Sequence, residues 1–169
     1  MSKNSARTLH LFIAVAVVLL DRWTKRLVAH RLALYAHIQV IPGLFRITHT
    51  ENTGAAFSIF ADSPSPWKTA MLIAFSVIAL GVVSVLLWKD NHANAATGIG
   101  LALIMGGALG NLWDRVVSGR VIDFLLFYVK RYEWPVFNLA DSAIVIGAGL
   151  LVLEILFHKS NAHEVPHPN

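Results

Sequence analysis

The chain has 169 residues, about the length of one ordinary domain. It is 56% hydrophobic and only 14% charged, with a mean hydropathy of +0.59, whereas a typical soluble domain has about 25% charged residues. A soluble globule cannot cover its surface with so few charges. Because the apolar residues also gather into stretches of about 20, enough to cross a bilayer core, the sequence predicts an integral membrane protein.

Fourteen Lys and Arg residues stand against ten Asp and Glu residues, giving a net charge of +4 and a pI of 9.7. The cations sit singly beside apolar segments, where they would meet lipid headgroups, so we expect no nucleic-acid partner. There is no cysteine, which excludes disulfides, thiol nucleophiles and thiolate metal sites. No H-E-x-x-H motif occurs either, and we expect neither a metal nor a cofactor.

The first apolar segment runs over 9–20 and is followed by charged residues, Asp21 and Arg22 first among them. A cleaved signal peptide would instead end in a small-x-small site. The sequence therefore predicts a retained membrane span over about 9–30.

The second span, 69–88, is the clearest, because its 20 residues include no charge. Trp67 and Lys68 precede it, and Lys89 and Asp90 follow it. Tryptophan and charged residues at both ends are typical of the two membrane interfaces.

A third span is predicted over about 93–113 and a fourth over about 136–157, followed by a polar tail, 158–169. The third span is rich in glycine and alanine. Gly106 and Gly110 form a G-x-x-x-G pair, which favours close approach of another helix.

Four spans place the two long loops, 31–68 and 114–135, on the same face of the membrane. Residues around Pro42 and Gly43 alternate imperfectly between apolar and polar, which suggests a small sheet lying on the membrane. The predicted fold is an all-α membrane protein with four transmembrane helices, forming one integral membrane domain over 1–169. A β-rich cradle is expected in the first long loop, and a short helical or irregular segment in the second.

An ionisable residue inside the membrane raises the free energy of insertion by about 2.5 to 3.5 kcal/mol on insertion scales, so its presence needs an explanation. Four aspartates fall where a span meets the long-loop face, namely Asp21, Asp114, Asp123 and Asp141. Asp21 and Lys25 are spaced i, i+4 and can pair on one helix face, which suits an anchor for the first span. Asp114 needs a partner from another element, and we expect a structural role for it.

Asp123 and Asp141 are separated by enough chain to leave the membrane and return, so their carboxylates can face each other. Two close carboxylates share one proton, and the ionised one can take a proton from water while its partner hydrogen-bonds a peptide carbonyl. This is the chemistry of an aspartic peptidase. Asp141 also suits a helix N-cap. Two other classes stay open: a small transporter or proton-relay protein using the boundary carboxylates, and a noncatalytic assembly subunit using Gly106 and Gly110.

Four sequence blocks resemble the successive signature blocks of lipoprotein signal peptidase (signal peptidase II). They are Asn-Thr-Gly-Ala-Ala-Phe at 52–57, Gly-Asn-Leu-Trp-Asp-Arg at 110–115, Val-Ile-Asp-Phe at 121–124 and Phe-Asn-Leu-Ala-Asp at 137–141. The resemblance extends from Asp21 through the fourth span, nearly the whole chain apart from its tails.

The resemblance implies a bacterial inner-membrane aspartic endopeptidase that removes signal peptides from prolipoproteins carrying a diacylglyceryl-modified cysteine. It assigns the catalytic dyad to Asp123 and Asp141. The residues that match positions around the family's site are Asn52, Gly54, Asn111, Arg115 and Asn138. Among these, Gly54 equally suits a turn and Asn138 a cap of the fourth span.

The cation count favours the opposite orientation from the one that the resemblance implies. Four cations lie on the face with the termini and ten toward the long loops, so the positive-inside rule alone puts the loops in the cytoplasm. The resemblance instead implies cytoplasmic termini, periplasmic loops and a site toward the periplasm. The expected partners are lipid-modified prolipoproteins and membrane lipids, and we expect a monomer. The sequence leaves open which lipoproteins are preferred and which aspartate holds the shared proton.

Overall fold

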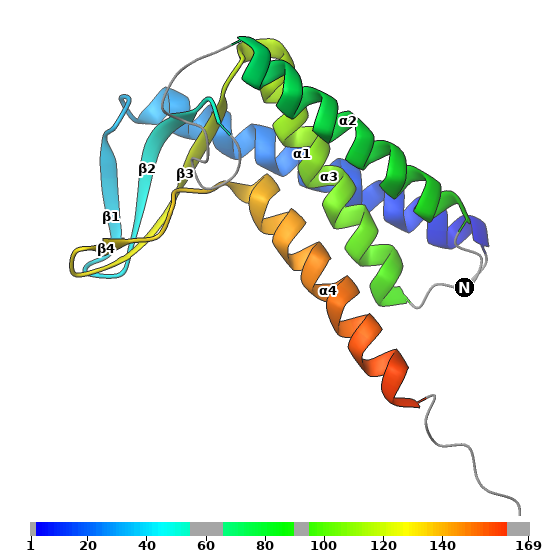
Figure 1. The fold of residues 1–169 in the computed structure, drawn as a ribbon. Helices are drawn as coiled ribbons and strands as arrows, with labels where there is room; N and C mark the ends of the chain where they lie inside the picture. Colours follow the sequence, from blue (N-terminus) through cyan, green and yellow to red (C-terminus); the bar gives the residue numbers. More distant parts are fainter. Residues whose placement is uncertain (1–2, 55–65, 90–94, 162–169) are drawn as a thin grey trace, which may run out of the picture.

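The computed structural model describes residues 3–54, 66–89 and 95–161, which form a helical bundle with a small sheet at one end (Figure 1). The helices are α1 (Lys3–Arg31), α2 (Pro66–Lys89), α3 (Ala95–Ser118) and α4 (Leu139–Asn161). The strands are β1 (His37–Ile41), β2 (Phe45–Asn52), β3 (Val121–Val129) and β4 (Tyr132–Glu133). The start of α1 and the end of α4 both lie away from the sheet.

Among the described residues, three helices are long and apolar enough to cross a membrane, over Trp67–Lys89, Ala95–Ser118 and Leu139–Phe157. They match the predicted second, third and fourth spans. α1 is not among them, and its second half carries the charged residues Asp21, Arg22, Lys25 and Arg26. The total of four membrane spans, with 9–30 as the first, therefore stays a prediction.

α3 extends beyond the predicted end of the third span at residue 113. It continues to Ser118, and Gly119 follows with a φ of +68°, the left-handed conformation that commonly ends a helix. Asp114 and Arg115 therefore lie on the helix rather than beyond it. Residues 90–94, which include the predicted start of the third span, and the end of the polar tail, 162–169, lie outside the described residues.

The sheet has the order β1-β2-β3-β4, and each neighbouring pair is antiparallel. β1 and β2 form the hairpin predicted at Pro42 and Gly43, and Gly43 has a φ of +79° in the turn. The expected β structure in the first long loop is therefore present.

Beyond Ser118, the second long loop forms strands rather than a helical or irregular segment, so this prediction is wrong. It contributes the nine-residue strand β3, which pairs with β2 so that Thr50 lies opposite Asp123 and Asn52 opposite Val121. The first six residues of β3 are all buried or half-buried. Such a strand reads as a continuous apolar run without the alternation that marks a half-buried strand.

Glycines let α3 lie tightly between α1 and α4. A Cβ atom at Gly106 would stand 2.7 Å from the carbonyl oxygen of Ala14 on α1, and one at Gly107 would overlap the carbonyl oxygen of Ala140 on α4. A Cβ at Gly110 would stand 2.8 Å from an oxygen of the Asp21 side chain. The packing role predicted for the glycine pair is confirmed, with Gly106 against α1.

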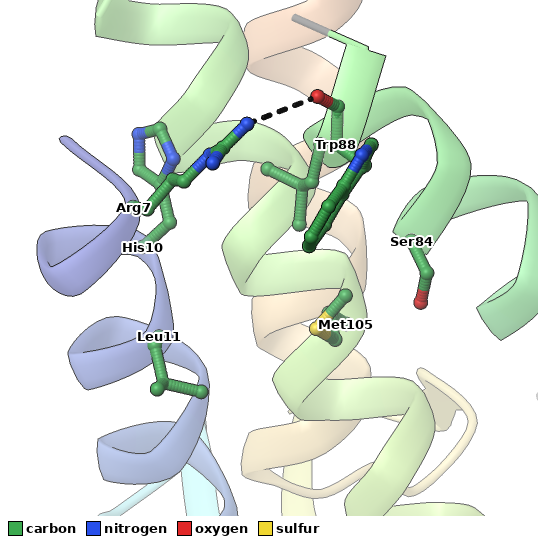
Figure 2. A pocket seen from close by; sticks show the side chains of 7 residues that line it. Arg7, His10, Leu11, Ser84, Trp88 and Met105 are labelled. Atoms are coloured by element: carbon green, nitrogen blue, oxygen red, sulfur yellow. Dashed lines mark hydrogen bonds between the residues drawn. The ribbon is translucent and has the colours of Figure 1, made fainter. Parts of the chain in front are cut away.

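α1 and α2 are joined at the end of the bundle away from the sheet. The Arg7 guanidinium lies over the Trp88 ring, 4.9 Å from its centroid, and donates a hydrogen bond of 3.5 Å to the Trp88 carbonyl oxygen (Figure 2). This contact ties the first turns of α1 to the last turn of α2.

Near the sheet, a buried cluster of ionised groups connects α1, α3 and α4. Lys25 is 3% exposed, and its Nζ lies 2.7 Å from Asp21 Oδ2 and 2.7 Å from Asp114 Oδ2. Asp21 Oδ1 accepts a hydrogen bond of 3.0 Å from the backbone N–H of Ala140. The i, i+4 contact expected on the first span is present, and the partners of Asp114 come from α1: Lys25 and, at 3.3 Å, Arg22.

We predict that Gly107→Val lowers the free energy of unfolding by about 1 to 3 kcal/mol, because its side chain must push α4 away from α3. Gly81→Val on α2 is the matched control, since nothing lies within 4 Å of a Cβ there. Thermal unfolding in detergent, followed by circular dichroism, measures both. Equal melting temperatures for the two variants would contradict the close α3–α4 contact.

We also predict that Lys25→Met destabilises the protein by about 3 to 5 kcal/mol, because it leaves the buried Asp21 without a cation and leaves Asp114 with Arg22 alone. The control is Arg26→Met, which removes the neighbouring, exposed cation on the same helix. Denaturant titration in detergent gives both values. A Lys25→Met protein as stable as the Arg26→Met protein would show that the cluster does not hold the helices.

Candidate active site

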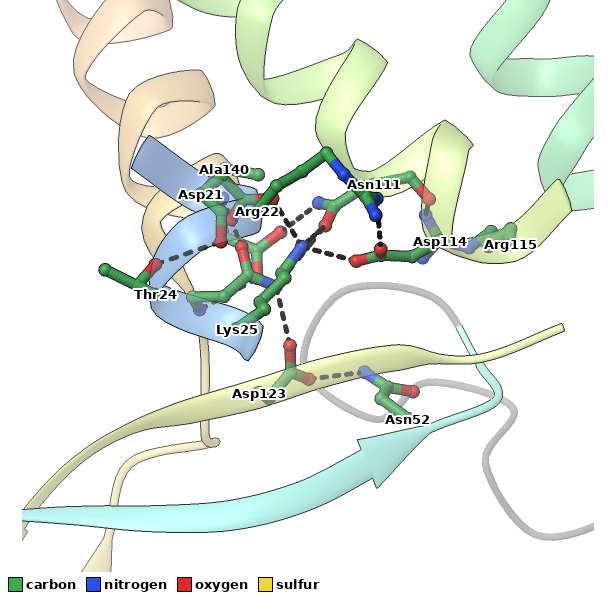
Figure 3. Close-up of polar contacts among 12 residues, drawn as sticks. Asp21, Arg22, Thr24, Lys25, Asn52, Asn111, Asp114, Arg115, Asp123 and Ala140 are labelled. Carbon is green, nitrogen blue, oxygen red and sulfur yellow. Dashed lines mark hydrogen bonds and ion pairs between the residues drawn. The ribbon is translucent and has the colours of Figure 1, made fainter. Parts of the chain in front are cut away.

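The two aspartates predicted to form a dyad lie where the sheet meets the helices. Asp123 is on β3, and Asp141 is in the first turn of α4. Figure 3 shows Asp123 on its strand facing the polar side chains of α1 and α3. Two asparagines, Asn111 and Asn138, connect the surroundings of the two carboxylates.

Asp123 is 3% exposed, and each of its carboxylate oxygens accepts one amide hydrogen bond. Oδ2 accepts from Asn52 Nδ2 at 3.0 Å, and Oδ1 accepts from Asn138 Nδ2 at 2.7 Å. The backbone oxygen of Asp123 accepts a hydrogen bond of 3.0 Å from the Thr50 hydroxyl on the paired strand. The strand pairing and the two amides thus fix the direction of this carboxylate.

Asp141 is half-buried and is held by groups from α3 and from its own helix start. Its Oδ1 accepts a hydrogen bond of 2.8 Å from Asn111 Nδ2, and its Oδ2 accepts one of 3.3 Å from the backbone N–H of Asn138. In return, the backbone N–H of Asp141 donates to Asn138 Oδ1 at 2.9 Å. This reciprocal pair is a capping box, in which the residue before the helix and the third helical residue satisfy each other's backbone donors.

Asn138 is completely buried and serves both aspartates. Its side-chain oxygen caps α4 through the Asp141 backbone, while its side-chain nitrogen donates to Asp123 and, at 3.3 Å, to Asn111 Oδ1. Asn138 therefore caps α4 with its side-chain oxygen and contacts Asp123 with its side-chain nitrogen.

The pKa of Asp123 is raised from its ordinary value to about 6. Burial is the largest cause, because it penalises the charged form, and the negative charge of Asp141 adds to it. The hydrogen bonds from Asn52 and Asn138 and the charge of Lys25 act in the opposite direction and lower this pKa. Asp123 therefore keeps a proton at pH values where an exposed aspartate has lost it.

Asn111 joins the ionised cluster to Asp141. Its Oδ1 accepts a hydrogen bond of 3.0 Å from Lys25 Nζ, and its Nδ2 donates to Asp141. Because Lys25 engages the oxygen, the amide must present its N–H₂ group to the carboxylate. Asp21, Lys25 and Asp114 thus form a network beside the dyad, with Asn111 between the two.

Gly54 and Arg115 hold the end of β2 close to α3. The Gly54 N–H donates to Asn52 Oδ1 at 2.8 Å, forming a local turn, and Arg115 Nη2 donates to the Gly54 carbonyl oxygen at 3.2 Å. Arg115 Nη1 also donates to the backbone oxygen of Asn111 at 3.3 Å. Gly54 therefore serves as a turn here. The rest of its signature block, 55–57, lies outside the described residues.

Every residue that the sequence singled out for this site is found in this region. Thr50 was missed, because one threonine in an alternating strand carries no signal before the strand pairing is known. The backbone N–H of Ala140, which donates to Asp21, was also missed. Every residue except proline has a backbone N–H group, so the sequence does not show which of them makes a contact. Among residues 3–54, 66–89 and 95–161, no three His, Asp or Glu side chains are grouped to hold a metal ion.

Comparison with known proteins supports the assignment to a family. A family model described as signal peptidase (SPase) II matches residues 13–157. Lipoprotein signal peptidase of Geobacter sulfurreducens is 48% identical over 154 residues, covering 88% of this chain and 93% of its own, and that of Solibacter usitatus is 42% identical over 153 residues, covering 90% and 93%.

A solved structure described as a bacterial membrane enzyme matches with a TM-score of 0.84 and 32% identity, covering 95% of both chains. A second structure of the same description matches with a TM-score of 0.78 and 33% identity, covering 88% of this chain and 93% of the other. The chain belongs to the signal peptidase II family and is a membrane aspartic peptidase of that type.

Proposed function

We propose that this peptidase cleaves diacylglyceryl-modified prolipoproteins with Asp123 and Asp141 as its catalytic dyad. The family supports cleavage of prolipoprotein signal peptides. The observation that carries the dyad is the shared amide of Asn138, which donates to Asp123 and accepts from the start of the helix that bears Asp141.

In the proposed reaction, ionised Asp141 takes a proton from a water molecule, and the water oxygen attacks the scissile carbonyl carbon. Protonated Asp123 hydrogen-bonds the carbonyl oxygen and stabilises the charge that develops there. The tetrahedral intermediate then collapses as Asp141 passes the proton that it took from water to the leaving nitrogen and the C–N bond breaks. The division of roles rests on the raised pKa of Asp123, and a substrate that displaces water raises this pKa further.

Asn52, Gly54, Asn111, Arg115 and Asn138 are proposed to support this chemistry. The three asparagines orient the two carboxylates, and Arg115 holds the turn at Gly54 next to them. Asp21, Lys25 and Asp114 are proposed to be structural. The site then depends on polar groups from α1, α3, α4 and both long loops.

We propose a single domain of four spans with both termini in the cytoplasm and the sheet in the periplasm of a bacterial inner membrane. The cation count opposes this orientation. Four of the ten cations are in ion pairs with acids, namely Arg22, Lys25, Arg46 and Arg120. The positive-inside rule counts Lys and Arg rather than net charge, so the proposed orientation rests on the family and not on this count.

A lipid-modified substrate suits a site at the edge of the membrane helices. The diacylglyceryl group would stay among the acyl chains while the peptide reaches the dyad laterally. The outward faces of the helices are strongly apolar, as for Phe75 on α2 and Ile155 on α4. We propose that the enzyme works as a monomer on such precursors. Transport is less well supported, because the dyad and the ionised cluster lie together at one end of the bundle and are held by hydrogen bonds.

We predict that Asp123→Asn and Asp141→Asn each reduce kcat by at least about a hundredfold, because each removes one half of the proton transfer. The matched control is Glu133→Gln, which changes an exposed acid of the sheet that pairs with Arg46. Cleavage is measured with lipidated and unlipidated precursor side by side. Near-normal cleavage by either asparagine variant would reject the dyad, and equal rates on both precursors would reject the lipid requirement.

The proton on Asp123 can be followed through its carbonyl stretching band in the infrared spectrum. We predict a midpoint near pH 6 for the wild type, assigned by its loss in Asp123→Asn. Asp141→Asn removes a negative charge and lowers the midpoint, whereas Asn52→Ala removes a donor to the carboxylate and raises it. Shifts in the opposite directions would contradict the proposed electrostatics.

A further inference from the structure

A pocket of about 300 Å³ lies between α1, α2 and α3 at the end of the bundle away from the sheet (Figure 2). Its lining residues are Arg7, His10, Leu11, Ser84, Leu87, Trp88 and Met105. Arg7 precedes Asp21 on α1 by fourteen residues, or about 21 Å of helix. The pocket is therefore separate from the dyad, and neither the family assignment nor the proposed reaction uses it.

One end of this pocket is cationic. Arg7 has five N–H donors, and toward the described residues it donates one hydrogen bond, to the Trp88 carbonyl oxygen, and stacks on the Trp88 ring. Within the described part of the chain, no carboxylate lies within 4 Å of this guanidinium. His10 lies beside Arg7, and Lys89, exposed at the end of α2, follows Trp88 directly. This end of the pocket suits an anion.

The rest of the pocket is apolar and faces outward. Figure 2 shows Leu11 and Met105 farther along the helices than Arg7 and His10. Leu11 is 64% exposed and Trp88 is 74% exposed, so these side chains lie on the outer surface of the bundle, where lipid would surround them. A cation at the membrane boundary above an apolar slot matches the two parts of a phospholipid, a phosphate and an acyl chain.

We propose that this pocket binds one anionic phospholipid, with its phosphate at Arg7 and the first part of an acyl chain along Leu11, Leu87 and Met105. The positive rim and the absence of a described acid beside Arg7 favour an anionic over a zwitterionic headgroup. In the proposed orientation this lipid belongs to the cytoplasmic leaflet. The substrate's diacylglyceryl group would approach from the other leaflet, so the two lipids do not compete.

The charge half of the proposal is tested by native mass spectrometry of the purified full-length protein in neutral detergent. Phosphatidylglycerol and phosphatidylcholine with identical acyl chains are titrated separately. We expect tighter binding of phosphatidylglycerol, and Arg7→Gln should weaken it by roughly fivefold. Arg26→Gln, which removes an exposed arginine at the other end of α1, should leave this affinity unchanged. Equal affinities for the two lipids, or equal effects of the two variants, would overturn the proposal.

The apolar half is tested by filling the slot without changing the charge. Leu11→Trp should weaken phosphatidylglycerol binding, whereas Leu19→Trp should not, since Leu19 is equally exposed on α1 but does not line the pocket. All four variants should cleave precursor at the wild-type rate in neutral detergent, because none of these residues contacts the dyad. Unchanged lipid affinity in Leu11→Trp would place the lipid elsewhere, even where the cleavage assay supports the dyad.

Discussion

The arrangement of this protein depends on one buried ammonium group, that of Lys25. It contacts Asp21 on its own helix, Asp114 on α3 and the side-chain oxygen of Asn111. Asp21 in turn binds the backbone at the start of α4, and Asn111 binds Asp141. A charge that would be costly alone at this depth is neutralised by neighbouring acids, and the same contacts position three helices around the site.

The helices could be predicted from the sequence, and the dyad of Asp123 and Asp141, which stays a prediction, was inferred for a different physical reason. A stretch of 20 residues without a charge, such as 69–88, strongly indicates a membrane helix, and Trp67 and Lys68 mark its start. The dyad rested on the chemistry of paired carboxylates and on four signature blocks. The partners of Asp114 could not be predicted, because they come from α1 and adjacent residues give no hint of contacts between helices.

The strand β3 was missed for a physical reason that also explains its role. Its run from Val121 is apolar at successive positions apart from Asp123, and apolar runs of this length do not distinguish a strand from a helix. Burial is the main cause of the raised pKa of Asp123. The burial that makes the strand hard to recognise from the sequence is thus also what keeps a proton on the Asp123 carboxyl group to higher pH.

The pairing of Asn52 with Val121 gives the chain an unusual order of assembly. β2 and β3 are neighbours in a simple meander, yet the whole α2–α3 hairpin is inserted between them. During synthesis, β2 is made before α2 and α3, and it can pair with β3 only after both of these helices have been made. Asp141 follows later still on α4. The two aspartates of the candidate site are therefore synthesised only after the first three helices.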